Sequence, residues 1–140
     1  MLHGEKWTIP ADLTEVGPLV EDAARFLERH GVGESVLYAS QLLIEETVSN
    51  VCRHAHCLGV QLEVSLNEAE IEFIVEDGGA PFDPLLEAPA PDLVSPLAER
   101  RVGGLGVHFV KSIADEVSYE RSEGANRLSM RLRGEYARRA

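Results

Sequence analysis

One long amphipathic stretch, residues 35–55, constrains the fold more than any other part of the chain. Wound at about 100° per residue, it gathers most of its apolar side chains on one broad face, which predicts a single long helix packed on a core. Ser35 can cap the first turn, because its hydroxyl can accept a hydrogen bond from an otherwise unpaired amide. The expected buried face comprises Val36, Ala39, Leu42, Leu43, Ile44, Thr47, Val48 and Val51, and the expected wet face comprises Gln41, Glu45, Ser49 and Cys52.

Two polar residues, Glu46 and Asn50, interrupt the apolar face of this helix one turn apart. Burying a carboxylate and an amide without partners is costly, so they need a reason to be there. In one interpretation they form hydrogen bonds with a neighbouring strand. In the other they line a pocket, where the carboxylate acts as a general base and the amide oxygen binds a hard cation such as Mg²⁺. The adjacent Glu45 falls on the wet face and is the weaker candidate base.

The composition is that of an ordinary globular protein, and we expect a single domain spanning residues 1–140. No run approaches the ~18 apolar residues of a membrane span. The first ten residues lack the basic start and apolar core of a signal peptide. We therefore expect a cytoplasmic protein that makes no membrane contact. The net charge of −11 argues against direct nucleic-acid binding, which usually needs a basic face.

A cluster of possible metal ligands follows the interrupted face: Cys52, His54, His56 and Cys57 occur in the order C-R-H-A-H-C. This spacing matches none of the common metal signatures, and Cys52 is expected on the wet side of the helix. Reduced structural thiols are therefore favoured over a zinc site in a cytoplasmic chain.

The remaining segments predict a sheet with helices on one side. Asp77 has the same parity as the inward residues of its strand, so a second acidic side chain is expected to point toward the buried layer. Helices that cover one face of a mixed, mostly antiparallel sheet form an α/β two-layer sandwich. In chain order, we expect a strand at 6–10, a helix at 14–30, the long helix, strands at 60–66 and 71–77, a glycine-rich turn running into a short helix over 103–113, and strands at 116–121 and 127–133.

Residues 78–102 form a long loop that holds five of the seven prolines. A loop of this length inside a compact domain is usually functional or mobile. The glycine-rich turn at 103–106 then opens a short helix, and such turns let backbone amides and the helix dipole hold phosphate. The turn lacks the G-K-[ST] of a P-loop. Phe109 stands where a dinucleotide-binding fingerprint requires a small residue, so that fold is excluded as well.

Three motifs occur in order: Glu46-x-x-x-Asn50 on a helix, Asp77-x-Gly79-x-Pro81-Phe82 after a strand, and a glycine turn before a helix. Together they resemble the N, G1 and G2 boxes of the histidine-kinase-like ATPases, which share the Bergerat ATP-binding fold. Within that superfamily the chain is most similar to the anti-sigma-factor serine kinases of bacterial partner-switching systems. The likeness is carried by EETVSNVCRHA, VEDGGAPFDP and GGLGVHFVKSIADEVSYER, and it covers nearly the whole chain.

The resemblance implies a role for each matching residue. Glu46 would be the general base that activates a serine hydroxyl, and Asn50 would bind the Mg²⁺ that bridges the ATP phosphates. Asp77 would bind the exocyclic amine of adenine, and Gly79 would let the backbone pass close to the base. Residues 84–102 would form a lid over the nucleotide. The other nucleotide-binding residues implied are Arg53, His54, Pro81, Phe82, Gly103, Gly104, Leu105, Gly106 and Val107.

The function implied is that of a protein kinase that uses ATP and Mg²⁺ to phosphorylate a serine of a small antagonist protein. Its target would be a sigma factor or an equivalent protein, and relatives of this kind are dimers. Two departures bear on this reading. Pro81 replaces a common glycine, and the last strand lacks a clear Gly-Thr pair, with Ala125, Asn126 and Ser129 nearby. A non-catalytic module that binds ATP only to set its conformation therefore stays open. A machine-driving ATPase is disfavoured because the chain has no transducer domain.

Overall fold

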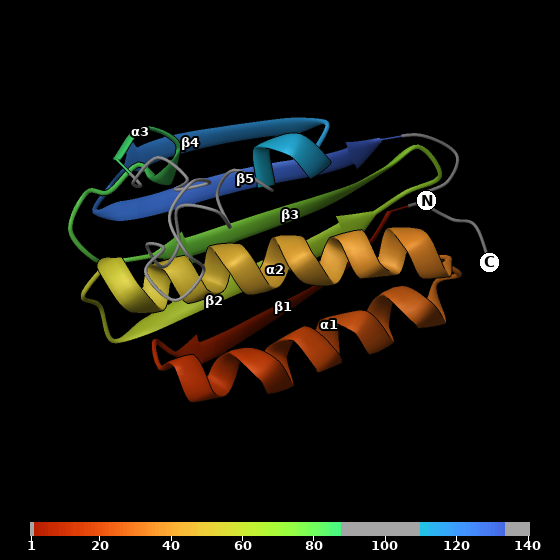
Figure 1. Cartoon of the computed structure of the whole chain (residues 1–140), viewed down its shortest axis with the longest axis horizontal. Helices are drawn as coiled ribbons and strands as arrows, with labels where there is room; N and C mark the ends of the chain where they lie inside the picture. The colour runs from red at the N-terminus through yellow and green to blue at the C-terminus, as the bar shows by residue number, and fades with distance from the viewer. Residues whose placement is uncertain (1, 88–109, 134–140) are drawn as a thin grey trace, which may run out of the picture.

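Alternation of apolar and polar residues builds one five-stranded sheet in the computed structural model, which describes residues 2–87 and 110–133 (Figure 1). The strands lie in the order β1-β2-β3-β5-β4, and all four pairings are antiparallel. Strand β5 thus lies between β3 and β4, although β4 precedes it in the sequence. The strands are β1 (His3–Pro10), β2 (Gly59–Leu66), β3 (Glu70–Asp77), β4 (Glu116–Ser122) and β5 (Ala125–Arg133).

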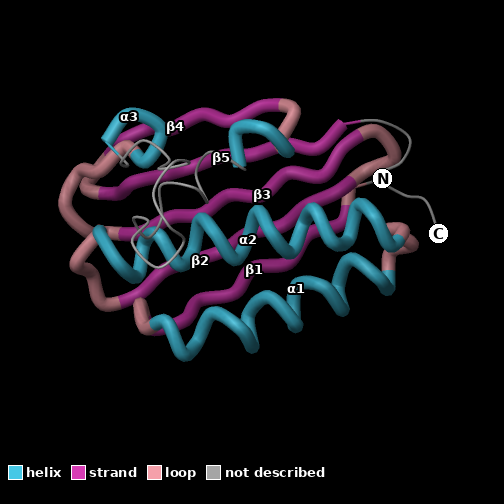
Figure 2. The backbone as a smooth tube through the Cα atoms, in the orientation of Figure 1, coloured by secondary structure: helices cyan, strands magenta, loops and turns pink. Residues whose placement is uncertain are grey.

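Two long helices lie side by side on one face of this sheet (Figures 1 and 2). Helix α2 contacts β2 and β3, whereas α1 packs against α2 and β1. No helix among the described residues covers the opposite face, so the two-layer α/β sandwich expected from the sequence is confirmed. The helices are α1 (Val16–Arg29), α2 (Glu34–His54) and the short α3 (Pro84–Glu87), with a 3₁₀ turn at Leu13–Glu15 and one helical turn at 110–113.

Helix α2 follows the sequence prediction with two corrections. It begins at Glu34 with Gly33 as the N-cap and no side-chain capping bond, so the prediction that Ser35 caps the helix is wrong. Ser49, expected on the wet face, is buried. The reason is that α1 packs along that side of α2, which converts part of the predicted wet face into a helix–helix contact. Glu45 is exposed as expected.

The inner face of the sheet forms the core with the helices. Side chains at alternate positions of β2, β3 and β5 are buried there, and Leu62, Phe73 and Met130 are wholly inaccessible to solvent. The outer face carries charged side chains instead. Ion pairs join β5 to its neighbours across this face: Arg127–Glu76, Arg131–Glu72 and Arg133–Glu116. These pairs are partly exposed, so each contributes little to stability.

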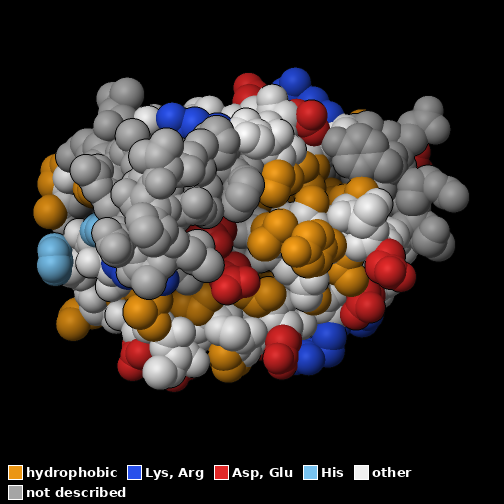
Figure 3. Space-filling model, viewed as in Figure 1, with side chains coloured by type: hydrophobic (Ala, Val, Ile, Leu, Met, Phe, Trp, Pro, Cys, Tyr) orange, Lys and Arg blue, Asp and Glu red, His pale blue; other side chains and the backbone are white. Residues whose placement is uncertain are grey.

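The helical face of the molecule mixes acidic and apolar side chains over α2 (Figure 3). The large apolar side chains that stay exposed include Leu13, Tyr38 and Leu58. Within the described ranges, no helix has both the length and the apolar character that a membrane crossing requires.

Two leucines four positions apart test where the core lies. Leu62 is 0% exposed and Leu58 is 97% exposed. We expect Leu62→Ala to lower the free energy of unfolding by about 2–5 kcal/mol, because it leaves a cavity under α2. The same substitution at Leu58 should change it by less than about 0.5 kcal/mol. Urea denaturation monitored by circular dichroism measures both, and equal losses would contradict this assignment of the core.

Candidate functional site

A pair of polar side chains closes one end of the buried layer. Asp77 ends β3 and lies directly opposite Asn126 of β5 in the strand register. Both are buried, with 7% and 4% of their surface exposed. The Asp77 Oδ1 atom accepts two hydrogen bonds of 2.9 Å, one from the Gly79 amide and one from Asn126 Nδ2. The carboxylate expected at the inward end of this strand is therefore present, and a neighbouring strand holds it in place.

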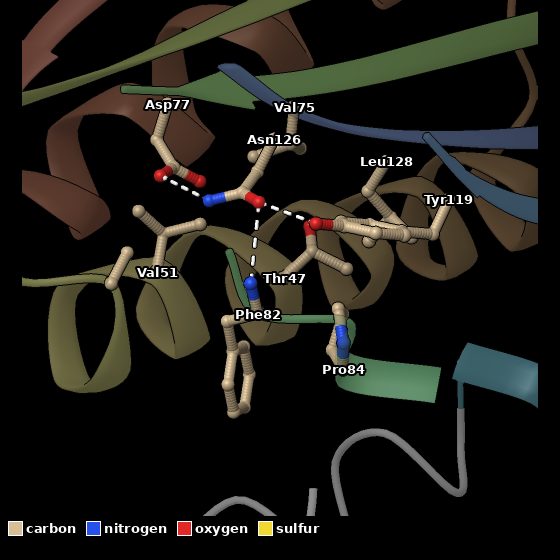
Figure 4. A pocket seen from close by; sticks show the side chains of 10 residues that line it. Thr47, Val51, Val75, Asp77, Phe82, Pro84, Tyr119, Asn126 and Leu128 are labelled. Carbon is tan, nitrogen blue, oxygen red and sulfur yellow. Dashed lines mark hydrogen bonds between the residues drawn. The ribbon is translucent and has the colours of Figure 1, made fainter. Parts of the chain in front are cut away.

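Asn126 is the centre of this hydrogen-bond network. Its Nδ2 also donates to the carbonyl of Ala80 at 2.9 Å. Its Oδ1 accepts from the backbone amide of Phe82 at 3.3 Å and from the hydroxyl of Tyr119. Both amide hydrogens and both lone pairs of one side chain are thus used. The network connects β3, the loop after β3, and β4 (Figure 4).

The loop after β3 is held from two sides. The Ala80 amide donates to the carbonyl of Ala55, just beyond α2, at 3.3 Å. From the other side, Arg121 of β4 donates to the carbonyl of Gly79 at 2.7 Å. A Cβ atom at Gly79 would lie 2.1 Å from the Ala55 carbonyl oxygen. Packing against the end of α2 therefore demands this glycine, and the expected close approach to a base stays a prediction.

A pocket opens beside this polar pair (Figure 4). It contains about 340 Å³ of space free of protein atoms, part of it open to solvent. Its walls are mostly apolar, and Asp77 and Asn126 supply polar groups at one end. Small-molecule sites have this character, with apolar walls and a few oriented polar groups. The lining residues are Thr47, Val51, Ala55, Val75, Asp77, Phe82, Pro84, Tyr119, Asn126 and Leu128.

Helix α2 supplies a second set of polar groups at spacings of one turn. Asn50 is buried, and within the described part of the chain its Oδ1 atom has no hydrogen-bond partner. The same is true of His54 Nε2, and the His54 ring stacks on Phe82 with 5.3 Å between ring centroids. A buried oxygen without a donor is a group that a hard cation can ligate, so Asn50 fits the Mg²⁺ predicted from the sequence.

Glu46 lies one turn before Asn50 and is half-buried. Burial raises the pKa of its carboxyl group, the negative charge of Glu45 raises it further, and the positive charge of Arg53 opposes both. A carboxylate with a raised pKa is a stronger proton acceptor than an exposed one, which suits a general base.

The cysteine and histidine cluster does not converge. Cys52 and Cys57 are free thiols, and partial burial raises the pKa of each. Among the described residues, no three His, Cys, Asp or Glu side chains are grouped so that they could hold a metal ion.

Comparison with known proteins identifies the family. The model of the histidine kinase-like ATPase domain matches residues 9–132, nearly the whole chain. The chain belongs to the histidine kinase-like ATPase domain family. This membership confirms the family inferred from the three sequence motifs, and it supports ATP as the ligand of the domain.

Two curated relatives are protein kinases by name. The chain is similar to the serine/threonine-protein kinase BtrW of Bordetella bronchiseptica, with 28% identity over 93 residues, and spans 65% of that protein's length. That match covers 64% of the present chain. It is also similar to the serine-protein kinase RsbW of Halalkalibacterium halodurans, with 28% identity over 122 residues that cover 84% of this chain and 75% of the relative.

A solved structure of the mycobacterial sensor histidine kinase MprB is also similar. It shares 17% identity, covers 91% of this chain and 98% of its own, and gives a TM-score of 0.48, too weak a likeness to add to the family match.

The histidine kinase-like ATPase domain brings part of the predicted site together. Asp77 and Phe82 line one pocket, and the Phe82 ring contacts His54. Arg53 and Pro81 are exposed. Gly103, Gly104, Leu105, Gly106 and Val107, and the predicted lid from residue 88 onward, lie outside the described residues.

Sequence reasoning missed how Asn126, Tyr119 and Thr47 contribute to this site. The sequence places Asn126 only near a missing Gly-Thr pair, yet in the structure it bonds Asp77 directly. The signal that could have found it is the β3–β5 register, since a residue paired with an inward carboxylate must itself point inward.

Replacing Gly79 tests the close packing of the loop against α2. We expect Gly79→Ala to lower the free energy of unfolding by about 1–3 kcal/mol, because the added Cβ meets backbone and not a flexible side chain. Thermal or urea unfolding measures this loss. Gly17→Ala is the matched control, because a Cβ at Gly17 meets nothing within 4 Å and alanine favours the helix by up to about 1 kcal/mol. A stable Gly79→Ala protein would contradict the packing argument.

Proposed function

We propose that this histidine kinase-like ATPase domain is a serine-protein kinase of the anti-sigma-factor type. It binds ATP with Mg²⁺ and phosphorylates a serine of a small antagonist protein. In the proposed cycle, the domain binds either that antagonist or a sigma factor or equivalent target, and phosphorylation of the antagonist frees the domain for the target. The names of the two curated relatives, both protein kinases, support this class of reaction.

The observation that carries the proposal is the arrangement on α2. A buried Asn50 oxygen without a partner follows, by one turn, a half-buried Glu46 whose pKa is raised. An unpaired buried amide oxygen costs stability unless a ligand completes it. A carboxylate with a raised pKa is typical of functional sites, where it accepts or donates a proton. One side chain to hold a cation and one to accept a proton are what a phosphoryl transfer requires of the protein.

Each group in the site has a task in this proposal. Asp77 and the apolar walls hold the adenine ring, with the carboxylate accepting from its amine. Asn50 Oδ1 would hold Mg²⁺, and the cation would supply neutralisation of charge on the phosphates. Glu46 accepts the proton of the serine hydroxyl. At the same time the serine oxygen bonds to the γ-phosphorus, and the bond between that phosphorus and ADP breaks.

The wider assembly is also part of the proposal. We infer a homodimer in the cytoplasm whose partners are the antagonist and its alternative target, with no direct contact to nucleic acid. The acidic character of the chain, with a net charge of −11, fits protein partners and a cation-complexed nucleotide.

Replacing the proposed base tests catalysis. We expect Glu46→Gln to lower the rate of γ-phosphate transfer from ATP to the cognate antagonist by at least about 10²-fold, because the amide cannot accept the serine proton. Binding of ATP, measured by calorimetry, should change little. Transfer is measured in a single turnover with radiolabelled ATP.

Glu45→Gln is the matched control for that experiment, because Glu45 is the exposed neighbour. It should keep transfer at neutral pH. Glu46 works only as the carboxylate, so the wild-type rate should fall as pH drops through the raised pKa of Glu46. Glu45→Gln should move that fall to lower pH, since it removes a charge that raises the pKa of Glu46. Full transfer by Glu46→Gln would remove the proposed base, and ATP binding without transfer in the wild type would indicate a non-catalytic module.

Substitutions of Asn50 should affect the stability of the nucleotide-free protein and its binding of Mg²⁺ in different ways. We expect Asn50→Leu to leave the melting temperature of the nucleotide-free protein unchanged or higher, because it removes an unpaired buried oxygen. The same change should abolish the additional rise in melting temperature that ATP gives when Mg²⁺ is present. Asn50→Asp keeps an oxygen ligand and should retain most of that rise. A normal Mg²⁺-dependent shift in Asn50→Leu would show that another residue holds the cation.

A further inference from the structure

We propose that Asn126 is the positioning residue that sets the selectivity of the site for a 6-aminopurine, by fixing the orientation of the Asp77 carboxylate. This inference rests on the proposed ATP-binding function. It gives Asn126 of β5 a task where the sequence shows only a departure from the expected Gly-Thr pair.

The two oxygens of Asp77 have different surroundings. Oδ1 accepts both the Gly79 amide and Asn126 Nδ2, so its hydrogen-bonding capacity is largely used within the protein. No described residue donates to Oδ2. Because Asp77 lines the pocket, Oδ2, which accepts from no donor in the described ranges, is the oxygen placed to accept an amine from a bound base. Without Asn126, the backbone amide of Gly79 would be the one described donor left on Oδ1, and a single bond restrains rotation of the carboxylate about its terminal bond less than two do.

Asn126 is suited to orienting Asp77 because it cannot itself bond a ligand. Its two N–H groups go to Asp77 and Ala80, and its oxygen accepts from Phe82 and Tyr119. A side chain with every donor and acceptor occupied has none to offer to a ligand, so Asn126 acts through Asp77. The four bonds also fix the carboxamide, which makes the orientation of Asp77 a property of the protein before any nucleotide binds.

The consequence for the ligand is selectivity at one position of the purine. A fixed carboxylate oxygen accepts the N–H of a 6-amino group but has nothing to gain from a base with hydrogen at that position. Sites built to bond one polar group reject analogues that lack it, because the buried polar group of the protein is then left unpaired. A carboxylate free to rotate would satisfy itself elsewhere, and the difference between the two ligands would shrink.

The experiment compares two nucleotides on the whole chain: ATP and purine riboside 5′-triphosphate, which lacks the 6-amino group. Isothermal titration calorimetry with Mg²⁺ gives Kd for each, and the readout is the ratio of the two Kd values. We expect the wild type to prefer ATP and Asn126→Ala to reduce that preference about tenfold, the effect of one hydrogen bond to a charged group. A merely structural role would weaken both nucleotides together and leave the ratio unchanged.

Three further variants sharpen the comparison. Asn126→Asp keeps the side-chain shape and the oxygen facing Phe82, but it turns a carboxylate toward Asp77, so it should also lose the preference. Arg121→Met removes a bond to the same loop that does not involve Asn126, the one from β4 to the Gly79 carbonyl. It should weaken both nucleotides and keep the ratio. Asp77→Asn should lose the preference for ATP over the analogue even with Asn126 in place.

The outcomes separate this inference from the proposed function. If the wild type binds neither nucleotide, both fail. If Asp77→Asn loses the preference while Asn126→Ala and Asn126→Asp keep it, ATP binding stands and the role of Asn126 is overturned. Should the Asn126 variants not fold, the side-chain amide resonance of Asn126 in the wild type decides by nuclear magnetic resonance. That resonance should shift with ATP and not with the analogue, and equal shifts would refute the inference.

Discussion

The antiparallel pairing of β3 with β5 is the constraint on which the rest of this structure depends. It joins segments that lie far apart in the chain, since residues 78–124 separate them. In doing so it completes the inner face on which α2 packs, and it puts Asn126 opposite Asp77. At that end of the sheet, the loop after β3 meets the end of α2 at Gly79 and Ala55. The core and the site are consequences of one register.

The buried polar groups of the domain divide into two kinds. Asn126 has all its hydrogen-bonding groups paired and holds Asp77 Oδ1, so the protein alone orders this end of the pocket. Asn50 and His54 keep atoms without partners among the described residues. An unpaired buried polar atom destabilises a fold and a paired one does not. The end of the site at Asn126 is therefore stabilising, whereas the end at Asn50 and His54 is destabilising in the absence of a ligand. The incomplete end is where chemistry with a charged ligand is proposed.

The sequence predicts the architecture well because its signals are local. Alternation and helical spacing depend only on neighbours, so the strands and α2 could be located within a few residues. Ser49 could not be assigned correctly, because its burial depends on where α1 packs. Asn126 could not be assigned either, because its partner Asp77 lies far away in the sequence and only the register joins them. Gly79 shows a third limit: a motif can mark a glycine correctly while the steric reason for it lies in another segment, here Ala55.

The mutual pairing of Asp77 and Asn126 has an evolutionary consequence. Substituting either residue alone leaves the other buried without its hydrogen-bond partner, which lowers the stability of the fold. Lineages that keep this arrangement should therefore exchange the two positions jointly or not at all, whereas Arg127 and Glu76, one rung further along on the open side of the sheet, are free to drift separately.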